Sequence, residues 1–173
     1  MKTKIKKIYK HKVIHNFMDN KGRLSDLSSF LKLLKENLNF DFNIRSLDDR
    51  IKLQKYIFIA KSFGLDLEYN YSLYIHGPYS PDLAKDYYNL NLKDYNTTQL
   101  EKRFNWSNFK LAVQGKSVKW LEISATALSV KETNPDLSRD ELLDILIKIK
   151  GEAYDKKDIK EIFNEAINYG FPL

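Results

Sequence analysis

The sequence predicts a mainly helical α+β domain with one small β element. Three observations lead to this prediction. Apolar residues recur at helical spacing through most of the chain, one short segment alternates with period two, and a serine, threonine or aspartate stands before most of the helical stretches as an N-cap. The 173 residues contain no internal repeat, low-complexity tract or linker rich in Pro and Gly, so we expect one domain over residues 1–173.

The most informative segment begins with a helix that opens near residue 47. Ser46 with Asp49 resembles a capping box, and Gly64 is suited to ending the helix in a left-handed conformation. One face of the helix is apolar and is expected to face the core: Leu53, Tyr56, Ile57, Ala60 and Phe63. The opposite side carries Lys52, Gln54 and Lys55, which we expect to lie away from the core.

A strand and a tight turn follow this helix. From Tyr69 to Ile75 the apolar residues alternate, which predicts a strand. Residues 76–81, His-Gly-Pro-Tyr-Ser-Pro, then turn the chain. Ser80 is a good N-cap and Pro81 suits the first helical position, so we expect another helix to begin here and to end near residue 91.

The remaining segments are predicted to be amphipathic helices. They lie at about 5–17, at 24–38 with a start after Gly22 or at Ser25, at 98–114, at 117–134, at 138–151 and at 155–170. Three helices followed by a strand also match the order of a winged-helix module. A winged-helix-like N-terminal half is therefore an alternative description of the first part of the chain.

The positive charge is concentrated at the N-terminus. The formal net charge is +6, and the first twelve residues carry six lysines and no acid: Lys2, Lys4, Lys6, Lys7, Lys10 and Lys12. The rest of the chain is balanced, with 23 basic and 23 acidic residues. The segment is either a solvated terminus or a basic arm over residues 1–12 that attracts nucleic acid or another acidic partner.

Several functional classes find no support in the composition. No apolar run approaches the ~20 residues that span a bilayer, so we expect no membrane partner. The lysine-dense N-terminus is unlike a secretory signal, and we expect a cytoplasmic protein. Without cysteine there is no disulfide or thiolate site, and no phosphate-binding or dinucleotide motif is present, so we expect no cofactor.

Two small constellations have a chemical interpretation beside a structural one. His11 and His15 share a helix face, but a metal site would need a third ligand such as His76, and two exposed histidines explain the pattern equally. Ser80 near His76 could act as a nucleophile, or the helix start after Ser80 could hold an anion. The simpler interpretation is that Ser80 caps a helix, and we expect no enzyme and no metal site.

The central motifs resemble those of a known family. Leu53-Gln-Lys-Tyr-Ile-Phe58, followed by Tyr74-Ile-His-Gly-Pro-Tyr-Ser-Pro-Asp-Leu-Ala84, is similar to the paired helix and Gly-Pro-Tyr-Ser-Pro loop of the YwgA-like proteins. More distantly it resembles the SocA-like (Panacea) antitoxin domain. Trp120-Leu-Glu122 and the Lys150-Gly-Glu-Ala-Tyr154 junction extend the similarity, which covers about residues 47–168. Tyr56 stands where the family usually has Leu.

The resemblance implies a non-enzymatic binding module that is antitoxin-like or regulatory. SocA-like members act by holding a toxin, so the resemblance implies a protein partner held by the aromatic loop and the adjacent helix face. The predicted partner-binding residues come from both motifs: Lys52, Gln54, Lys55, Tyr56, Tyr74, His76, Gly77, Pro78, Tyr79 and Ser80. Aromatic side chains favour interfaces when they are exposed, but they also fill cores.

The alternative function is that of a DNA-binding transcriptional regulator. In a winged-helix reading, the helix that carries Lys52, Gln54 and Lys55 would be the recognition helix. Gln and Lys suit base edges and phosphates, and the lysine arm would add sequence-independent affinity. Against this, Asp48 and Asp49 stand at the start of the helix, where base contacts would be expected.

Overall fold

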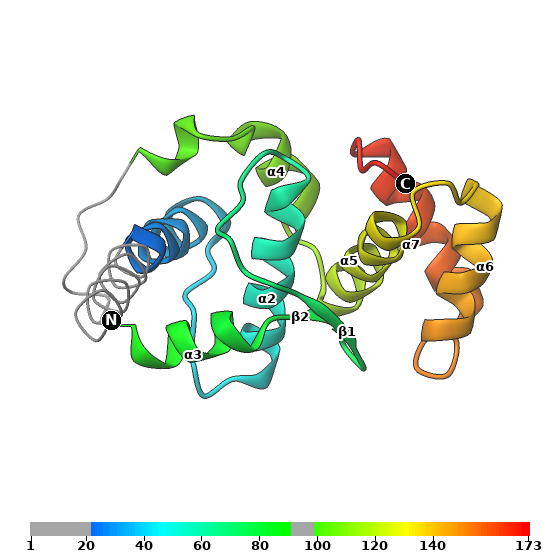
Figure 1. Ribbon diagram of the computed structural model, residues 1–173, viewed down its shortest axis with the longest axis horizontal. Helices are drawn as coiled ribbons and strands as arrows, with labels where there is room; N and C mark the ends of the chain where they lie inside the picture. The colour runs from blue at the N-terminus through cyan, green and yellow to red at the C-terminus, as the bar shows by residue number, and fades with distance from the viewer. Residues whose placement is uncertain (1–21, 91–98) are drawn as a thin grey trace, which may run out of the picture.

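The helix α2 (Leu47–Lys61) lies at the centre of the fold (Figure 1). This computed structural model describes residues 22–90 and 99–173. The described chain is mainly helical with one two-stranded antiparallel sheet, which confirms the predicted fold class. The helix expected at 5–17 lies outside the described residues. No helix in the described ranges combines the length and apolar character needed to cross a bilayer.

Helix α2 begins as the sequence predicts. The Ser46 hydroxyl accepts a hydrogen bond from the Asp49 amide at 3.2 Å, and Asp48 and Asp49 lie in the positive first turn. From residue 53 to 60 every side chain is buried, so the helix is covered on all sides rather than along one stripe. Such a helix forms the middle of a core, whatever the polarity of its individual residues.

Two groups of helices cover α2. On one side a helix over residues 22–38 and α4 (Trp106–Val113) pack through aromatic rings, with the Phe30 and Phe109 centroids 5.7 Å apart. On the other side α5 (Val118–Thr133) packs against α2, α6 (Arg139–Lys150) and α7 (Lys156–Asn168). In Figure 1 the β-hairpin lies between these two groups, and α5 contacts its second strand.

Most of the predicted helix starts are confirmed. Ser117 caps α5, Ser138 and Glu141 form a complete capping box on α6, and Asp155 caps α7. The helix predicted at 98–114 is different. It consists of a short 3-10 helix, η1 (Leu100–Lys102), then a turn and α4, because Asn105 supplies a second N-cap that restarts the helix.

The β element differs from the predicted strand over 69–75. The alternation of burial starts earlier, at Leu65, and continues through Leu67 and Tyr69 without a paired strand. Among the described residues, regular pairing is confined to β1 (Ser72–Tyr74) and β2 (Gly77–Tyr79), with Tyr74 opposite Gly77. The segment predicted as a loop therefore contains β2, and the turn of the hairpin is at residues 75–76.

Helix α3 (Pro81–Asn89) follows β2 directly. Ser80 is its N-cap, with the Leu83 amide donating to the Ser80 hydroxyl at 3.3 Å, as predicted. The Asp86 carboxylate accepts from the Tyr69 hydroxyl at 2.9 Å and from the Arg23 guanidinium at 2.8 Å. These contacts tie α3 to the extended chain before the hairpin and to the helix over residues 22–38.

Gly77 is placed where only glycine fits. Its φ is +88°, and a Cβ at this position would lie 2.7 Å from the Thr126 hydroxyl and 3.6 Å from the Lys55 side chain. We expect Gly77→Ala to lower the free energy of unfolding by about 2–5 kcal/mol, because left-handed strain and overpacking add. Urea unfolding measures the loss.

Gly115→Ala is the matched control, because Gly115 also has a positive φ, +70°, but no atom lies within 4 Å of an added Cβ. At Gly115 only the left-handed backbone strain contributes, so the expected loss in the free energy of unfolding is about 1–2 kcal/mol. Equal losses in the two variants would contradict a packing role for Gly77.

Candidate functional site

The two family-like motifs meet through the side chain of Gln54. Its Nε2 donates to the Ser80 carbonyl at 3.0 Å, and its Oε1 accepts from the Ser80 amide at 2.9 Å. One buried amide therefore bonds both main-chain groups of Ser80, the N-cap of α3. This pairing explains physically why a Gln on α2 accompanies the Gly-Pro-Tyr-Ser-Pro segment.

Two buried lysines hold carbonyls of the hairpin. Lys55 Nζ donates to the Pro78 carbonyl at 2.7 Å, and Lys150 Nζ donates to the Ile75 carbonyl at 2.9 Å. Lys55 and Lys150 are only 1% and 2% exposed. They come from α2 and from the end of α6, so each end of the turn is fixed by a different helix.

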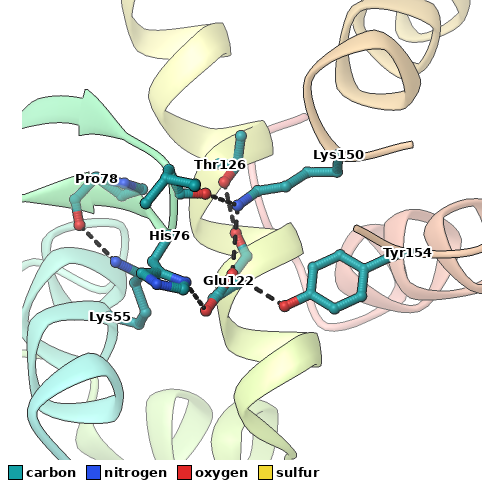
Figure 2. A network of polar contacts seen from close by, with 8 residues as sticks. Lys55, His76, Pro78, Glu122, Thr126, Lys150 and Tyr154 are labelled. Carbon is teal, nitrogen blue, oxygen red and sulfur yellow. Dashed lines mark hydrogen bonds and ion pairs between the residues drawn. The ribbon is translucent and has the colours of Figure 1, made fainter. Parts of the chain in front are cut away.

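Glu122 on α5 supplies the negative charge for this cluster (Figure 2). Its Oε2 lies 3.3 Å from Lys150 Nζ and accepts from the Tyr154 hydroxyl at 3.0 Å. Its Oε1 lies 3.0 Å from His76 Nδ1, which brings the turn of the hairpin to α5. We call Lys55, Glu122 and Lys150 the charge clamp.

The charge clamp contains two ammonium groups and one carboxylate. Burial lowers the pKa of Lys55 from 10.5 to about 7; Glu122 raises this pKa, and Lys150 lowers it. Burial also lowers the pKa of Lys150, against the opposing effect of Glu122. Burial and the Glu122 charge raise the pKa of Tyr154 to about 12. The clamp therefore has an excess of positive charge, in a poorly solvated place, below about pH 7, where Lys55 is protonated, and is balanced above it.

The hairpin tip, residues 73–76, is exposed although its backbone is held. Leu73, Tyr74 and Ile75 are 44%, 54% and 86% exposed. Beside the tip lies a groove of about 300 Å³ between α2, the hairpin and α3. Its lining residues are Leu47, Arg50, Ile51, Gln54, Lys55, Tyr74, Ile75, His76, Gly77, Tyr79, Tyr87 and Tyr88. The tip and the groove together form the candidate site.

Burial divides the residues predicted to bind a partner. Tyr74 and His76 are exposed, while Lys52 and Tyr79 are half-buried. The others are buried: Gln54, Lys55, Tyr56, Gly77, Pro78 and Ser80. The expectation that Gln54 and Lys55 lie away from the core is wrong, because both are buried and bind main chain inside the protein, Lys55 at Pro78 in β2 and Gln54 at Ser80 directly after it. Their role in the structure is to position the hairpin.

The same burial bears on the DNA-binding alternative, because Gln54 and Lys55 are buried and only Lys52 is partly exposed. A recognition helix must enter a groove of the duplex with one face free, whereas α2 is covered on all sides from residue 53 to 60. The lysine arm on which that alternative also relies, with Lys2, Lys4, Lys6, Lys7, Lys10 and Lys12, lies outside the described residues.

The structure bears on the nucleophile suggested at Ser80, but not on the metal pair suggested at His11 and His15. Ser80 is fully buried and its hydroxyl caps α3, and His76 Nδ1 faces Glu122. Ser80 is therefore poorly placed to act as a nucleophile with His76 as its base. His11 and His15 lie outside the described residues. Within residues 22–90 and 99–173, no three His, Cys, Asp or Glu side chains gather as metal ligands would.

Sequence reasoning assigned no role to Glu122, Lys150 or Tyr154. A signal was present, because all three stand inside the C-terminal segments that resemble the family, Trp120-Leu-Glu122 and Lys150-Gly-Glu-Ala-Tyr154. Arg50, Ile75 and the exposed rim residues Leu47 and Tyr88 were also missed. Ile75 stands inside the Tyr74-Ile-His-Gly-Pro segment, but its place in the predicted strand gave no sign of its exposure. Nothing in the sequence context of Leu47, Arg50 and Tyr88 distinguishes them from ordinary surface positions.

Comparison with protein-family models, with curated proteins and with solved structures finds no match for this chain. The similarity to the YwgA-like and SocA-like proteins therefore rests on the motif residues alone. The clamp and the Gln54 contacts give those residues a structural reason to occur together.

The clamp predicts an unequal response to the removal of its charges. Glu122→Gln leaves two buried ammonium groups without a carboxylate, so we expect a loss of about 3–5 kcal/mol in the free energy of unfolding. Lys55→Met removes the excess charge and leaves one carbonyl unbonded, so about 1–3 kcal/mol is expected. Denaturant titration measures both.

Lys119→Met serves as the control for these two variants. Its ion pair with Asp158 is 41% exposed on both sides, and such a pair contributes about 0–1 kcal/mol. If Lys55→Met costs more than Glu122→Gln, the clamp does not carry an excess of positive charge.

The lowered pKa of Lys55 also predicts how stability depends on pH. Above about pH 7 the folded state releases the Lys55 proton, while the unfolded chain keeps it up to the ordinary pKa of 10.5. The unfolded state then binds more protons, so stability rises with pH, by up to about 1.4 kcal/mol per unit from this group. We expect Lys55→Met to reduce this rise between pH 7 and 9 in denaturant titrations. An unchanged slope would show that Lys55 titrates normally.

Proposed function

We propose that the protein is a non-catalytic binding module that holds a protein partner at the hairpin tip and the adjoining groove, in the manner of an antitoxin. The observation that carries the proposal is the 86% exposure of Ile75 on a turn whose backbone is fixed by buried charges. Large apolar side chains grouped on a surface are typical of sites that bind other proteins.

The rigidity of the tip supports this proposal. The Ile75 and Pro78 carbonyls are each bonded to a buried ammonium group, and Ser80 is bonded to Gln54 at both main-chain groups. A surface that is ordered before binding loses little conformational entropy on association. Burying charge to hold an exposed apolar turn is a stability cost that a purely structural hairpin would not need.

The shape of the site indicates how a partner would contact it. The groove is bordered by the large exposed side chains Leu47, Tyr74, Ile75 and Tyr88. A volume of about 300 Å³ accommodates a few side chains, so we propose that the partner inserts an apolar segment there while the tip packs against its surface. The family resemblance makes a toxin the expected kind of partner.

Selection of peptides on the full chain tests this function. We expect a display library of random peptides of about twelve residues to yield binders, because grooves of this kind recognise short segments. Ile75→Asp should weaken them by at least about ten-fold, since it places a charge in the apolar contact. Binding is measured by fluorescence anisotropy.

Leu111→Asp is the matched control, because Leu111 is a 63% exposed apolar residue on α4 that is absent from the groove lining. It should leave binding unchanged. Failure to select binders, or binders that tolerate Ile75→Asp as well as Leu111→Asp, would refute the proposed site.

A further inference from the structure

We infer that the segment received by the groove is acidic as well as apolar, and that its carboxylate supplies the negative charge that the charge clamp lacks. This inference rests on the proposed function, and it names the chemistry of the partner at the same site. It follows from the charges of the described residues, from the lining of the groove and from the exposed rim.

The first argument is the imbalance of charge in the clamp. Glu122 is shared between Lys150 and His76 and also accepts from Tyr154. Lys55, by contrast, is bonded to the neutral Pro78 carbonyl. A buried ammonium group without its own counter-charge is unfavourable, and an anion placed beside it is correspondingly favoured.

The second argument is the charge of the groove lining. Arg50, Lys55 and His76 are its ionisable basic residues, and no Asp or Glu is among the residues that line it. Arg50 donates to the Ile44 carbonyl at 2.7 Å, which fixes its guanidinium at the edge of the groove. His76 is half exposed, with its Nδ1 turned to Glu122. A carboxylate entering the groove would meet positive charge from α2 and from the hairpin.

The third argument is the apolar rim, which excludes a simple anion. Leu47, Ile75 and Tyr88 are 56%, 86% and 59% exposed around the same groove. A ligand that fits both the basic lining and the apolar rim carries Leu- or Phe-like side chains next to Asp or Glu. The chain's own N-terminal twelve residues have the wrong charge for this site, since they contain six lysines and no acid.

The inference also predicts a dependence of binding on pH. The charges that act on Lys55 are those of Glu122 on α5 and Lys150 at the end of α6. The Glu122 carboxylate also contacts His76 on the hairpin and Tyr154 after α6. A carboxylate ligand binds the protonated amine better than the neutral one. Affinity should therefore fall as the pH rises through about 7, where Lys55 releases its proton.

A charge-matched peptide array tests the inference on the full chain. The peptides have about twelve residues, carry Leu and Phe at varied positions in a Ser background, and contain either Glu, Gln or Lys at matched sites. We expect Glu peptides to bind at least about ten-fold more tightly than Gln peptides, and Lys peptides to bind most weakly. The preference for Glu should decrease from about pH 6 to about pH 8.5.

Variants identify the groups responsible. Lys55→Met should reduce the preference for Glu over Gln, and so should Arg50→Gln, which keeps the protein testable if Lys55→Met does not fold. Lys119→Met, which removes a lysine of α5 that is not in the groove lining, should leave the preference unchanged. His76→Gln separates an effect of the imidazole from that of Lys55 in the pH series.

The outcomes separate the inference from the proposed function. If Glu and Gln peptides bind equally and Ile75→Asp weakens both, the groove binds apolar segments and the acidic inference is overturned. Preferential binding of Lys peptides overturns it too. If no peptide in the three sets binds, both the inference and the proposed function fail.

Discussion

The position of Glu122 between two buried lysines is the interaction on which the rest of the site depends. Its carboxylate contacts Lys150 and lies beside His76, while Lys55 and Lys150 hold carbonyls on the two sides of the turn. Charges buried to this degree are tolerated only when they are paired and hydrogen-bonded. Removing the carboxylate would therefore disturb the α2, α5 and α6 contacts together with the hairpin.

The hairpin illustrates how side chains can replace strand length. Strands of three residues form few ladder hydrogen bonds, and an isolated two-stranded hairpin is marginal in water. Here Lys55 and Lys150 bond main-chain carbonyls of the hairpin from two helices, and Gln54 bonds the main chain of Ser80 directly after β2. Gln54 and Lys55, which belong to the segment over residues 53–58, thus support the hairpin and the start of α3 from inside the protein. The side chains left for contact with other molecules are those at the hairpin tip and on the groove rim.

Most helix starts in the described residues could be predicted from the sequence, but the candidate site could be predicted only in part. Capping by Ser46, Ser80, Ser117, Ser138 and Asp155 is confirmed, because a cap involves residues three or fewer positions apart. Lys55 was misplaced, because a lysine on a helix is normally solvated and its partner Pro78 lies 23 positions later. Ile75 was placed in a half-buried strand, since alternation does not show where pairing ends. The burial of Lys55 and the exposure of Ile75 both depend on contacts between segments that are distant in the sequence.

The long span of the contact between Lys150 and Ile75 has a consequence for synthesis and assembly of the chain. The two residues are 75 positions apart, so the turn emerges well before the side chain that secures it. A nascent polypeptide that ends with α5 already contains Lys55, which holds Pro78, but it lacks the Lys150 contact to Ile75, because non-local contacts form only once both segments are available. The turn therefore gains its second support only when translation has passed α6.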